Sequence, residues 1–491
     1  MAQFLPVPRI DLAPGLSISR VLTGLWQLAD MERDGRAIDL ARTATAMQPY
    51  VDAGLTTFDM ADHYGSAELV AGIFRSRDTG TVQCLTKWVP KPGRVSKAEV
   101  RTAVERALAR LQAESLDLLQ YHAWNYADPS WLETLYDLQD LKREGLIRQL
   151  GLTNVDTAHL RMVRNSGIEV VSNQVSFSLL DQRAAAGLAP YCEVSGVGLL
   201  AYGTVAGGWL TEKWLGQPEP DWERTGTWSM MKYGRFLRVA GGWDALQRVL
   251  AAAKVVATRH GVSIANIATR YILDQPGVAG VIVGARLGER AHIDDTLRLF
   301  SFSLSDEDRA DIRTALQTLA PIPGDCGDEY RTPPFLTASG DLSHHLQSMP
   351  APYETRAGAD GRTRCLSGTV WETAAGFARA IRHGQHIAVS GTTATLGDRA
   401  IGGQDAASQT HFAIDKVEGA LQSLGAALTD VVRTRVYVRH VRDWEAVARA
   451  HGERFGRIQP ANTLVGAELI GDEYLVEVEA DAIARPLIDT D

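Results

Sequence analysis

The stretch Phe58-Asp59-Met60-Ala61-Asp62-His63-Tyr64 lies where a predicted β-strand ends and a loop begins. Residues 51–60 read as the end of a helix, a glycine turn and a short strand. Asp59 then stands at the carboxyl end of that strand, and Tyr64 follows in the loop. An aspartate and a tyrosine placed in this way can meet a substrate from one side. Because such a pair is usually structural, its meaning depends on the other strands.

Short apolar segments alternate with amphipathic helices from about residue 17 to residue 285. The expected strands are 20–26, 56–59, 82–87, 116–122, 148–153, 170–175, 197–202 and 280–283. Eight strands with intervening helices over about 270 residues predict a closed (β/α)₈ TIM barrel. An open doubly wound sheet is the alternative. Such a sheet normally binds nucleotides through GxGxxG, and the chain has neither that motif nor GxxxxGK[ST].

Length and composition narrow the classes of protein to consider. The chain has 491 residues, too many for one ordinary domain, and its net charge of −9 argues against nucleic-acid binding. No apolar run reaches the roughly 18 residues of a membrane span, and no secretory signal is visible. The four cysteines lack CxxC spacing, so we expect free thiols, no metal site and a cytoplasmic location.

Most expected strands end in, or are followed closely by, a polar or aromatic residue, as in barrel enzymes, where the chemistry lies at the carboxyl ends of the strands. In chain order these residues are Trp26, Asp59, Lys87, His122, Asn154, Gln174 and Tyr202. A tyrosine is too weak an acid for carbonyl reduction unless a cation stabilises its phenolate. A lysine can do this, an aspartate can hold the lysine, and a histidine can orient the carbonyl. The residues that supply these functions are Asp59, Tyr64, Lys87 and His122.

A family resemblance rests on seven short motifs, which are 58–65, 85–87, 120–122, 151–154, 173–174, 201–202 and 283–286. From about residue 15 to residue 320 the chain resembles the aldo-keto reductase family. The resemblance implies that Tyr64 is the acid/base, assisted by the other three residues. It also implies that NADP(H) or NAD(H) lies extended across the mouth of the barrel, without a Rossmann domain.

The resemblance also implies a set of cofactor-binding residues, namely Gly24, Trp26, Asp59, Thr153, Asn154, Gln174, Tyr202, Gly203, Gly284, Arg286 and Arg290. Among them Thr153, Asn154 and Gln174 would bind the carboxamide, and Tyr202 would stack on the nicotinamide. The last three would hold the adenosine phosphate end, where two arginines favour NADP(H) over NAD(H). Thr153 replaces the usual serine and keeps a hydroxyl, whereas Asp294 puts an anion where the family often has asparagine.

The substrate pocket is harder to read. Tryptophans follow the first, third and fourth strands, so Trp26, Trp88 and Trp124 could form an aromatic wall. The aromatic-rich stretch 203–243 is either a lid over the pocket or packing on the outside of the barrel. Its aromatic residues include Trp209, Trp214, Trp222, Trp228, Tyr233 and Phe236.

The C-terminal part has a different pattern. We assign residues 1–320 to the barrel, 321–365 to a Pro- and Gly-containing linker or docking segment, and 366–491 to a second domain. The expected elements of this second domain are strands at 387–390, 431–438 and 474–480 and helices at 409–424 and 444–455. Strands with helices on one face indicate an α+β fold.

Motifs at 389–393, 425–426, 430–438, 459–461 and 476–480 resemble the reactive-intermediate deaminase (Rid/YjgF) family. The resemblance implies a homotrimer, or a multiple of three, with clefts between subunits formed by Ser390, Gly391, Asn462 and Glu477. Asn462 stands where deaminating members have the arginine that grips a substrate carboxylate, and Asn cannot replace that bidentate cation. We therefore expect an uncharged ligand, or trimerisation alone.

Three hypotheses follow. The chain is a carbonyl reductase trimerised by its C-terminal domain, a bifunctional enzyme whose second domain hydrolyses a reactive product, or a redox sensor that binds nicotinamide with little turnover. Aldehydes, ketones and sugars all remain open as substrates.

Overall fold

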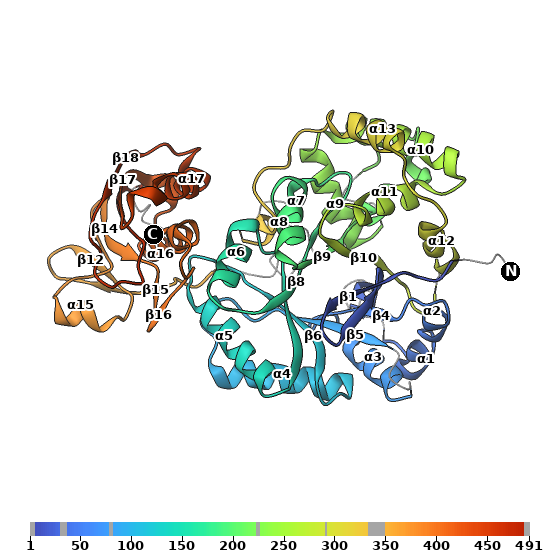
Figure 1. The fold of residues 1–491 in the computed structure, drawn as a ribbon, viewed down its shortest axis with the longest axis horizontal. Helices are drawn as coiled ribbons and strands as arrows, with labels where there is room; N and C mark the ends of the chain where they lie inside the picture. The colour runs from blue at the N-terminus through green and yellow to red at the C-terminus, as the bar shows by residue number, and fades with distance from the viewer. Residues whose placement is uncertain are drawn as a thin grey trace.

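The computed structural model describes residues 5–29, 37–77, 82–221, 226–289, 292–331 and 349–485. Figure 1 shows a large barrel, coloured blue to yellow, beside a smaller domain, coloured orange to red. In the described residues no helix combines the length and the apolar character needed to traverse a membrane.

The large body is a closed barrel of eight parallel strands, as predicted, in which the last strand pairs with the first. The strands are β3 (Val21–Gly24), β4 (Thr57–Asp59), β5 (Gln83–Trp88), β6 (Leu116–His122), β7 (Ile147–Thr153), β8 (Val170–Ser176), β9 (Gly198–Tyr202) and β10 (Val278–Gly284). All strands run in the same direction, so their carboxyl ends meet at one mouth of the barrel.

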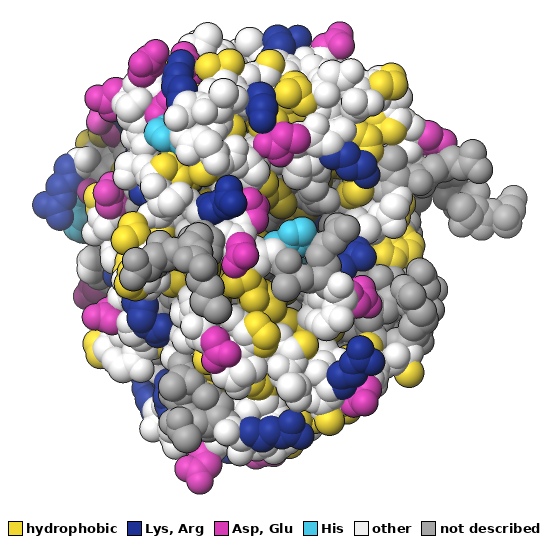
Figure 2. All heavy atoms as spheres, turned by 90° about the vertical axis from the view of Figure 1, so that its right-hand side faces the viewer, with side chains coloured by type: hydrophobic (Ala, Val, Ile, Leu, Met, Phe, Trp, Pro, Cys, Tyr) yellow, Lys and Arg dark blue, Asp and Glu magenta, His cyan; other side chains and the backbone are white. Residues whose placement is uncertain are grey.

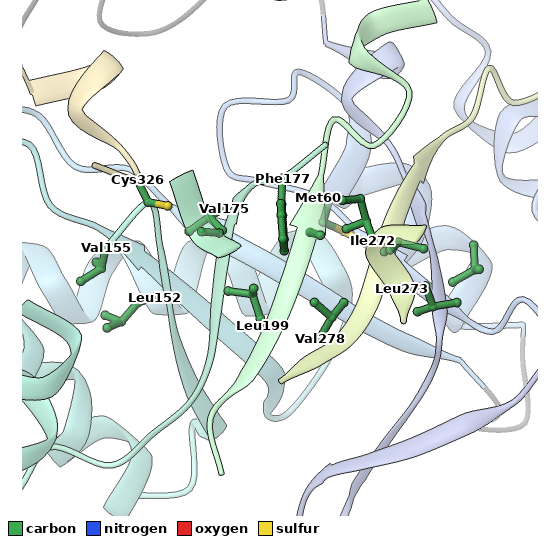
Figure 3. Close-up of a cluster of buried hydrophobic side chains, with 14 of the residues drawn as sticks. Met60, Leu152, Val155, Val175, Phe177, Leu199, Ile272, Leu273, Val278 and Cys326 are labelled. Atoms are coloured by element: carbon green, nitrogen blue, oxygen red, sulfur yellow. The ribbon is translucent and has the colours of Figure 1, made fainter. Parts of the chain in front are cut away.

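Helices surround this barrel. The longer ones are α3 (Ala67–Arg75), α4 (Lys97–Leu111), α5 (Ser130–Arg143), α6 (Thr157–Asn165), α8 (Leu188–Ser195), α9 (Trp228–Val239), α10 (Gly242–His260), α11 (Ile264–Leu273) and α13 (Asp306–Leu316). Ser96 and Glu99 form a capping box at the start of α4. Figure 3 shows the apolar layer between strands and helices, where Val175 and Leu199 lie near Phe177 and Val278.

A hairpin of β1 (Arg9–Ala13) and β2 (Leu16–Ser19) precedes the barrel and was not predicted. Leu12, Leu16 and Ile18 belong to a buried cluster with Leu22 and Leu118 of the barrel strands. Apolar and polar residues alternate in both strands, on either side of a turn at Pro14-Gly15, so the sequence does carry a hairpin signal that the predicted strands left out.

The smaller domain is a seven-stranded sheet packed against α16 (Ala406–Ser423) and α17 (Trp444–Phe455). The strand order is β11 (Glu354–Ala357), β12 (Arg362–Leu366), β13 (Ala380–His383), β14 (His386–Thr393), β19 (Val476–Ile483), β17 (Val431–Val438) and β18 (Ala461–Gly466). The predicted α+β class is confirmed. The structure differs at β11 and β12, which lie within the stretch read as linker, because these exposed polar strands lack an apolar pattern.

Helices α6 and α16 pack against each other where the two bodies meet. His159 is buried there between two carboxylates, with Nδ1 2.8 Å from Asp156 Oδ2 and Nε2 3.1 Å from Asp415 Oδ2. Arg454 in turn contacts Asp415 and Glu418. Burial lowers the pKa of His159, but the two aspartates outweigh it and raise the pKa to about 9. The domains are therefore joined by a buried imidazolium.

Candidate active site

The centre of the barrel mouth is a buried ion pair between β4 and β5. Lys87 Nζ lies 2.8 Å from Oδ1 and 2.7 Å from Oδ2 of Asp59, and both residues are almost fully buried. Burial lowers the pKa of Lys87, and the charge of Asp59 opposes this change. Because Asp59 closes β4 and β5 is its parallel neighbour, the barrel itself brings the two side chains together.

Two glutamines also bind Asp59. Gln174 Nε2 donates to Asp59 Oδ1 at 2.7 Å and to Gln120 Oε1 at 2.9 Å, while Gln120 Nε2 lies 3.4 Å from the same Asp59 oxygen. Gln174 was expected to bind a carboxamide, and here its amide nitrogen is directed to the ion pair. The sequence analysis did not single out Gln120, although it lies two residues before His122 on β6, facing the same side of the strand.

His122 closes β6 and is buried with no hydrogen-bond partner at Nε2. Burial and the nearby charge of Arg331 lower the pKa of His122 to about 3, so the ring is neutral at physiological pH. A neutral imidazole with a free nitrogen at the barrel mouth can share a hydrogen bond with a substrate oxygen.

Tyr64 lies in the loop after β4, between two aromatic rings. Its ring centroid is 4.9 Å from that of Trp26 and 4.8 Å from that of His63, both edge-on. Lys87 Nζ lies 5.0 Å from the centroid of Tyr64. The structure thus brings the four predicted catalytic residues to one mouth, where all four line a cavity of about 940 Å³.

Aromatic side chains contribute to the cavity wall in part as expected. Trp26 and Trp124 line the cavity, whereas Trp88 is buried against Tyr121, with centroids 5.9 Å apart. Because side chains alternate along a strand, Trp88 points away from the barrel interior when Lys87 points into it. Figure 2 shows one face of the molecule, where basic, acidic, histidine and hydrophobic side chains intermingle around a central hollow.

The residues expected at the nicotinamide lie together on β7, β8 and β9. Tyr202 Oη donates to Asn154 Oδ1 at 2.8 Å, and Thr153 Oγ1 donates to the carbonyl of Gln174 at 3.1 Å. Asn154 has φ of +60°, a left-handed conformation that asparagine tolerates. The strand ends therefore present a tyrosine ring and amide groups to the cavity, which suits a flat ring bearing a carboxamide.

Two glycines at this mouth allow neighbouring side chains to pack directly against the backbone. A Cβ at Gly203, where φ is +75°, would lie 2.2 Å from Tyr233 Oη, and one at Gly24 would lie 2.8 Å from Ile282 Cγ2. Gly284 and Arg286 line the cavity further along. Arg290 lies outside the described residues, and Asp294 is exposed at the start of α12 (Ile293–Leu297). The residues that line the mouth thus fit an extended nicotinamide cofactor. Among the described residues there is no cluster of side chains that could bind a metal ion.

The stretch after β9 packs on itself and also contributes to the cavity wall, while its role as a lid stays a prediction. Trp209, Trp214 and Trp243 pack on one another at centroid distances of 4.6 to 6.0 Å, and Trp214 also lines the cavity. Residues of α9, among them Trp228 and Lys232, line the cavity. Trp222 lies outside the described residues.

Residues after the last barrel helix also reach the site, which the sequence analysis missed. Tyr330 lines the cavity, with its ring 5.5 Å from that of His122 and its hydroxyl 3.4 Å from Tyr202 Oη. Arg331 Nη1 donates to the Asn154 carbonyl at 2.7 Å. Cys326 packs in the barrel core nearby (Figure 3). Because this short α14 (Asp328–Arg331) lies in the stretch read as linker, no strand-end rule could locate it.

In the smaller domain three of the four expected residues lie together. Glu477 packs directly on Gly391, since its Oε1 would lie only 2.0 Å from a Cβ placed on that glycine. Ser390 precedes this glycine, and its Oγ donates a hydrogen bond to the carbonyl of Ala378 at 2.8 Å. Asn462 lies two strands away on β18, where it donates to Thr434 Oγ1 at 2.9 Å. One chain therefore does not assemble all four.

Comparison with known proteins agrees with this geometry. The model of the Aldo/keto reductase family matches residues 20–317. The chain belongs to the aldo/keto reductase family. A second model, Endoribonuclease L-PSP, matches residues 369–484, and the C-terminal domain is of the YjgF/Rid type. The barrel is thus an oxidoreductase domain that acts on a carbonyl or alcohol, in a family that uses nicotinamide cofactors.

Individual relatives cover the two parts separately. Aldo-keto reductase YhdN of Bacillus subtilis is 25% identical over 65% of this chain and 96% of its own length. An uncharacterized protein of Streptomyces coelicolor is 41% identical over 24% of this chain and 90% of its own length. The structure of a glycerol dehydrogenase from Gluconobacter oxydans covers 66% of this chain and 98% of its own, at 23% identity and a TM-score of 0.52. The last likeness shows the fold alone.

Proposed function

We propose that the barrel interconverts a carbonyl compound and an alcohol with NADP(H), using Tyr64 as the acid/base. The observation that carries this proposal is the buried Lys87–Asp59 pair beside Tyr64, in one cavity with a neutral His122. A bound nicotinamide supplies or accepts the hydride. NADP(H) is favoured over NAD(H) by the cation of Arg286 at the cavity wall.

The chain's own residues account for the proton. His122 Nε2 and the Tyr64 hydroxyl orient the substrate oxygen, and Tyr64 gives its proton to that oxygen as hydride reaches the carbon. The Lys87 cation then stabilises the phenolate by Coulomb attraction, and the charge of Asp59 opposes the lowering of the Lys87 pKa by burial. The alcohol forms by the addition of one hydride and one proton, and the reverse direction uses the same groups.

The test is NADPH oxidation with a panel of aldehydes, ketones and aldoses, for the native chain and Tyr64→Phe. We expect turnover to fall at least 10³-fold, on the order of what a general acid contributes, while NADPH affinity stays nearly unchanged. Tyr271→Phe, which alters a buried tyrosine of α11, is the matched control. Undiminished turnover in Tyr64→Phe would remove this residue from its role, and cofactor binding without turnover on any substrate would favour the redox-sensor hypothesis.

For the C-terminal domain we propose assembly into trimers or multiples of three, with Asn462 of one subunit facing the Ser390–Gly391–Glu477 group of the next. Support comes from the match to the YjgF-type family and from the separation of Asn462 from the other three residues within one chain. Light scattering on the full chain should give three, or a multiple of three, times the mass of one chain. A monomeric mass would contradict the proposal.

A further inference from the structure

The contact between the two domains lies close to the cofactor side of the barrel mouth. Asp415 of α16 is 3.1 Å from His159 Nε2 of α6, and both side chains are buried. His159 Nδ1 lies 2.8 Å from each carboxylate oxygen of Asp156, which caps the start of α6. Asn154, two residues before Asp156, directly follows β7 and lines the cavity. The domain interface is therefore only a few residues away from a strand end of the barrel site.

Tyr126 joins His159 to the segment that follows the last barrel helix. The imidazole of His159 stacks on the ring of Tyr126, with centroids 3.5 Å apart and planes inclined by 12°. Cζ of Arg331 lies 4.0 Å from the centroid of the same ring, and Nη2 of Arg331 donates to the Tyr126 hydroxyl. An aromatic face attracts a cation through its quadrupole. Because both cations contact this one ring, a shift of His159 changes the surface on which Arg331 packs.

Arg331 in turn holds the backbone of Asn154. Its Nη1 donates to the Asn154 carbonyl at 2.7 Å, and its Nη2 donates to the same oxygen. Asn154 has a φ of +60°, a conformation that persists only when the surrounding structure stabilises it. Its side-chain Oδ1 accepts a hydrogen bond from Tyr202 Oη, and both residues line the cavity. The two hydrogen bonds from Arg331 therefore fix how the Asn154 amide is presented to the cavity.

The segment that carries Arg331 fits directly against Asn154. A Cβ at Gly327, where φ is +88°, would collide with the Asn154 carbonyl. Arg183 holds the same segment to the barrel, with Nη1 2.8 Å from Glu329 Oε2 and 2.8 Å from the Asp325 carbonyl. Closely packed groups transmit a displacement instead of absorbing it. A change in the position of Arg331 is therefore passed on to Asn154.

A second ion pair of the same interface provides a comparison. Arg161, two residues after His159 on α6, lies 2.8 Å from Asp405 at the start of α16, and its side chain is 48% exposed. Residues two apart on a helix leave its axis in different directions, about 200° apart. Arg161 thus joins the same two helices as His159 without sharing the helix face that contacts Tyr126.

We propose that docking of the C-terminal domain positions Asn154 for binding of the cofactor. Asp415 and His159 are positioning residues in this proposal, and they act through Tyr126 and Arg331. The inference rests on the proposed function, since it takes Asn154 as a ligand of the nicotinamide carboxamide. It goes beyond that function because it gives the second domain a part in the barrel reaction that is separate from trimer formation.

The experiment is calorimetric titration of the full-length chain with NADPH and with adenosine 2′,5′-bisphosphate, which has the adenosine phosphate end but no nicotinamide. Asp415→Asn removes the charge that faces His159 with little change of shape. It should weaken NADPH binding about three- to tenfold and leave binding of the bisphosphate unchanged. Arg161→Met, the matched control, should leave both affinities unchanged, whereas a general loss of structure would weaken both ligands together.

A double-mutant cycle tests whether the effect passes through Arg331. Arg331→Met removes both hydrogen bonds to the Asn154 carbonyl and should weaken NADPH binding about tenfold. In that background Asp415→Asn should have little further effect, whereas Arg161→Met and Arg331→Met should be additive. Arg331→Lys keeps a cation and a donor, so it should recover part of the affinity.

A further variant keeps the test decisive if Asp415→Asn does not fold. Tyr126→Phe keeps the stacked ring and removes the hydroxyl that Arg331 binds, so it should weaken binding of NADPH and not of the bisphosphate. Unchanged NADPH affinity in the folded variants, or equal losses for the two ligands, would overturn this inference and leave the proposed function intact. A native chain that binds no NADPH would overturn the proposed function and this inference with it.

Discussion

Lys87 in the barrel and Arg379 in the smaller domain are both buried cations, but their surroundings differ. Lys87 has both carboxylate oxygens of Asp59 within 2.8 Å. Arg379 has carbonyl and hydroxyl oxygens at one nitrogen and an unpartnered Nε. A cation with a built-in counter-charge needs none from its ligand, whereas a cation without one is stabilised by an anion. The burial of charge is therefore compensated differently at the two sites, by one paired carboxylate at Lys87 and by carbonyl and hydroxyl oxygens at Arg379.

The largest effect is expected when the barrel site is made to resemble the second. Asp59→Asn leaves Lys87 buried without a counter-charge, so the pKa of Lys87 should fall further and the lysine should stabilise the phenolate of Tyr64 less. We expect turnover to fall about 10²- to 10⁴-fold and the free energy of unfolding to fall by about 3 kcal/mol. Steady-state kinetics and chemical denaturation measure both. Asp62→Asn is the control, because Asp62 lies in the loop after β4 and is partly exposed. Equal losses of turnover and of unfolding free energy in the two variants would refute the special role of Asp59.

The imidazolium of His159 is a third buried cation, and its two carboxylates come from different domains. His159→Gln should lower the free energy of unfolding by about 3 kcal/mol, because it leaves buried carboxylates without their cation. Since the folded-state pKa of about 9 lies above the ordinary value of 6.5, this stabilisation is complete below about pH 6.5 and is lost as pH rises through about 9.

Thermal unfolding from pH 6 to pH 9.5 checks this pH dependence. The difference between native chain and His159→Gln should be greatest at low pH and should shrink toward pH 9.5. His260→Gln removes a His–Asp contact on the outside of the barrel, where His260 Nε2 is 2.8 Å from Asp308. If the control showed the same profile, the effect would not belong to the domain interface.

A smaller effect is expected at Gly203, beside the barrel site. Gly203→Ala adds a Cβ at a left-handed φ and 2.2 Å from Tyr233 Oη, so Tyr233 must shift. We expect a loss of about 2 kcal/mol in stability, of which the backbone accounts for about 1 to 2 kcal/mol, and weaker NADPH binding. Gly208→Ala also has a left-handed φ but open space around the Cβ, so it reports the backbone cost alone. Unfolding curves and cofactor titration separate the two costs.

The smallest effect on stability is expected at Gly391, the equivalent test in the second domain. A Cβ there would lie 2.0 Å from Glu477 Oε1, the end of a flexible side chain, and the φ of Gly391 is not in the left-handed region. Gly391→Ala should therefore cost less than about 1 kcal/mol, because the Glu477 side chain can move away from the added Cβ. Chemical denaturation measures this cost, with Gly452→Ala, which has nothing near its Cβ, as the control. A loss well above about 1 kcal/mol at Gly391 alone would show that Glu477 is held rigidly.

The elements that were predicted well are those whose sequence carries its own signal. Strands 431–438 and 116–122 and helix 444–455 have the bounds that were expected. The four residues of the proposed catalytic set could be found because barrel strands end at one mouth, so a residue's position along its strand gives its place in the site. Side-chain alternation could also have excluded Trp88 once Lys87 was assigned to the interior.

The residues that were missed lie in segments whose position no local pattern fixes. Tyr330 and Arg331 reach the barrel site from a short helix in the stretch read as linker. Strands β11 and β12 are mostly polar, with β11 at the edge of the sheet and β12 next to it, and Arg379 precedes its strand among residues of mixed polarity. In each case the role depends on which distant residues the chain meets, and periodicity carries no information about that.

The eight barrel strands, the class of both domains and the residue types at the barrel mouth could be read from the sequence alone, because these depend on local periodicity and on a rule of the fold. The pairing of buried charges could not, because it is a property of the packed chain. Lys87 meets Asp59 and His159 meets Asp415, while Arg379 meets no carboxylate at ion-pair distance among the described residues. Pairing depends on distances of a few ångströms between residues far apart in the chain, and those distances are set by packing.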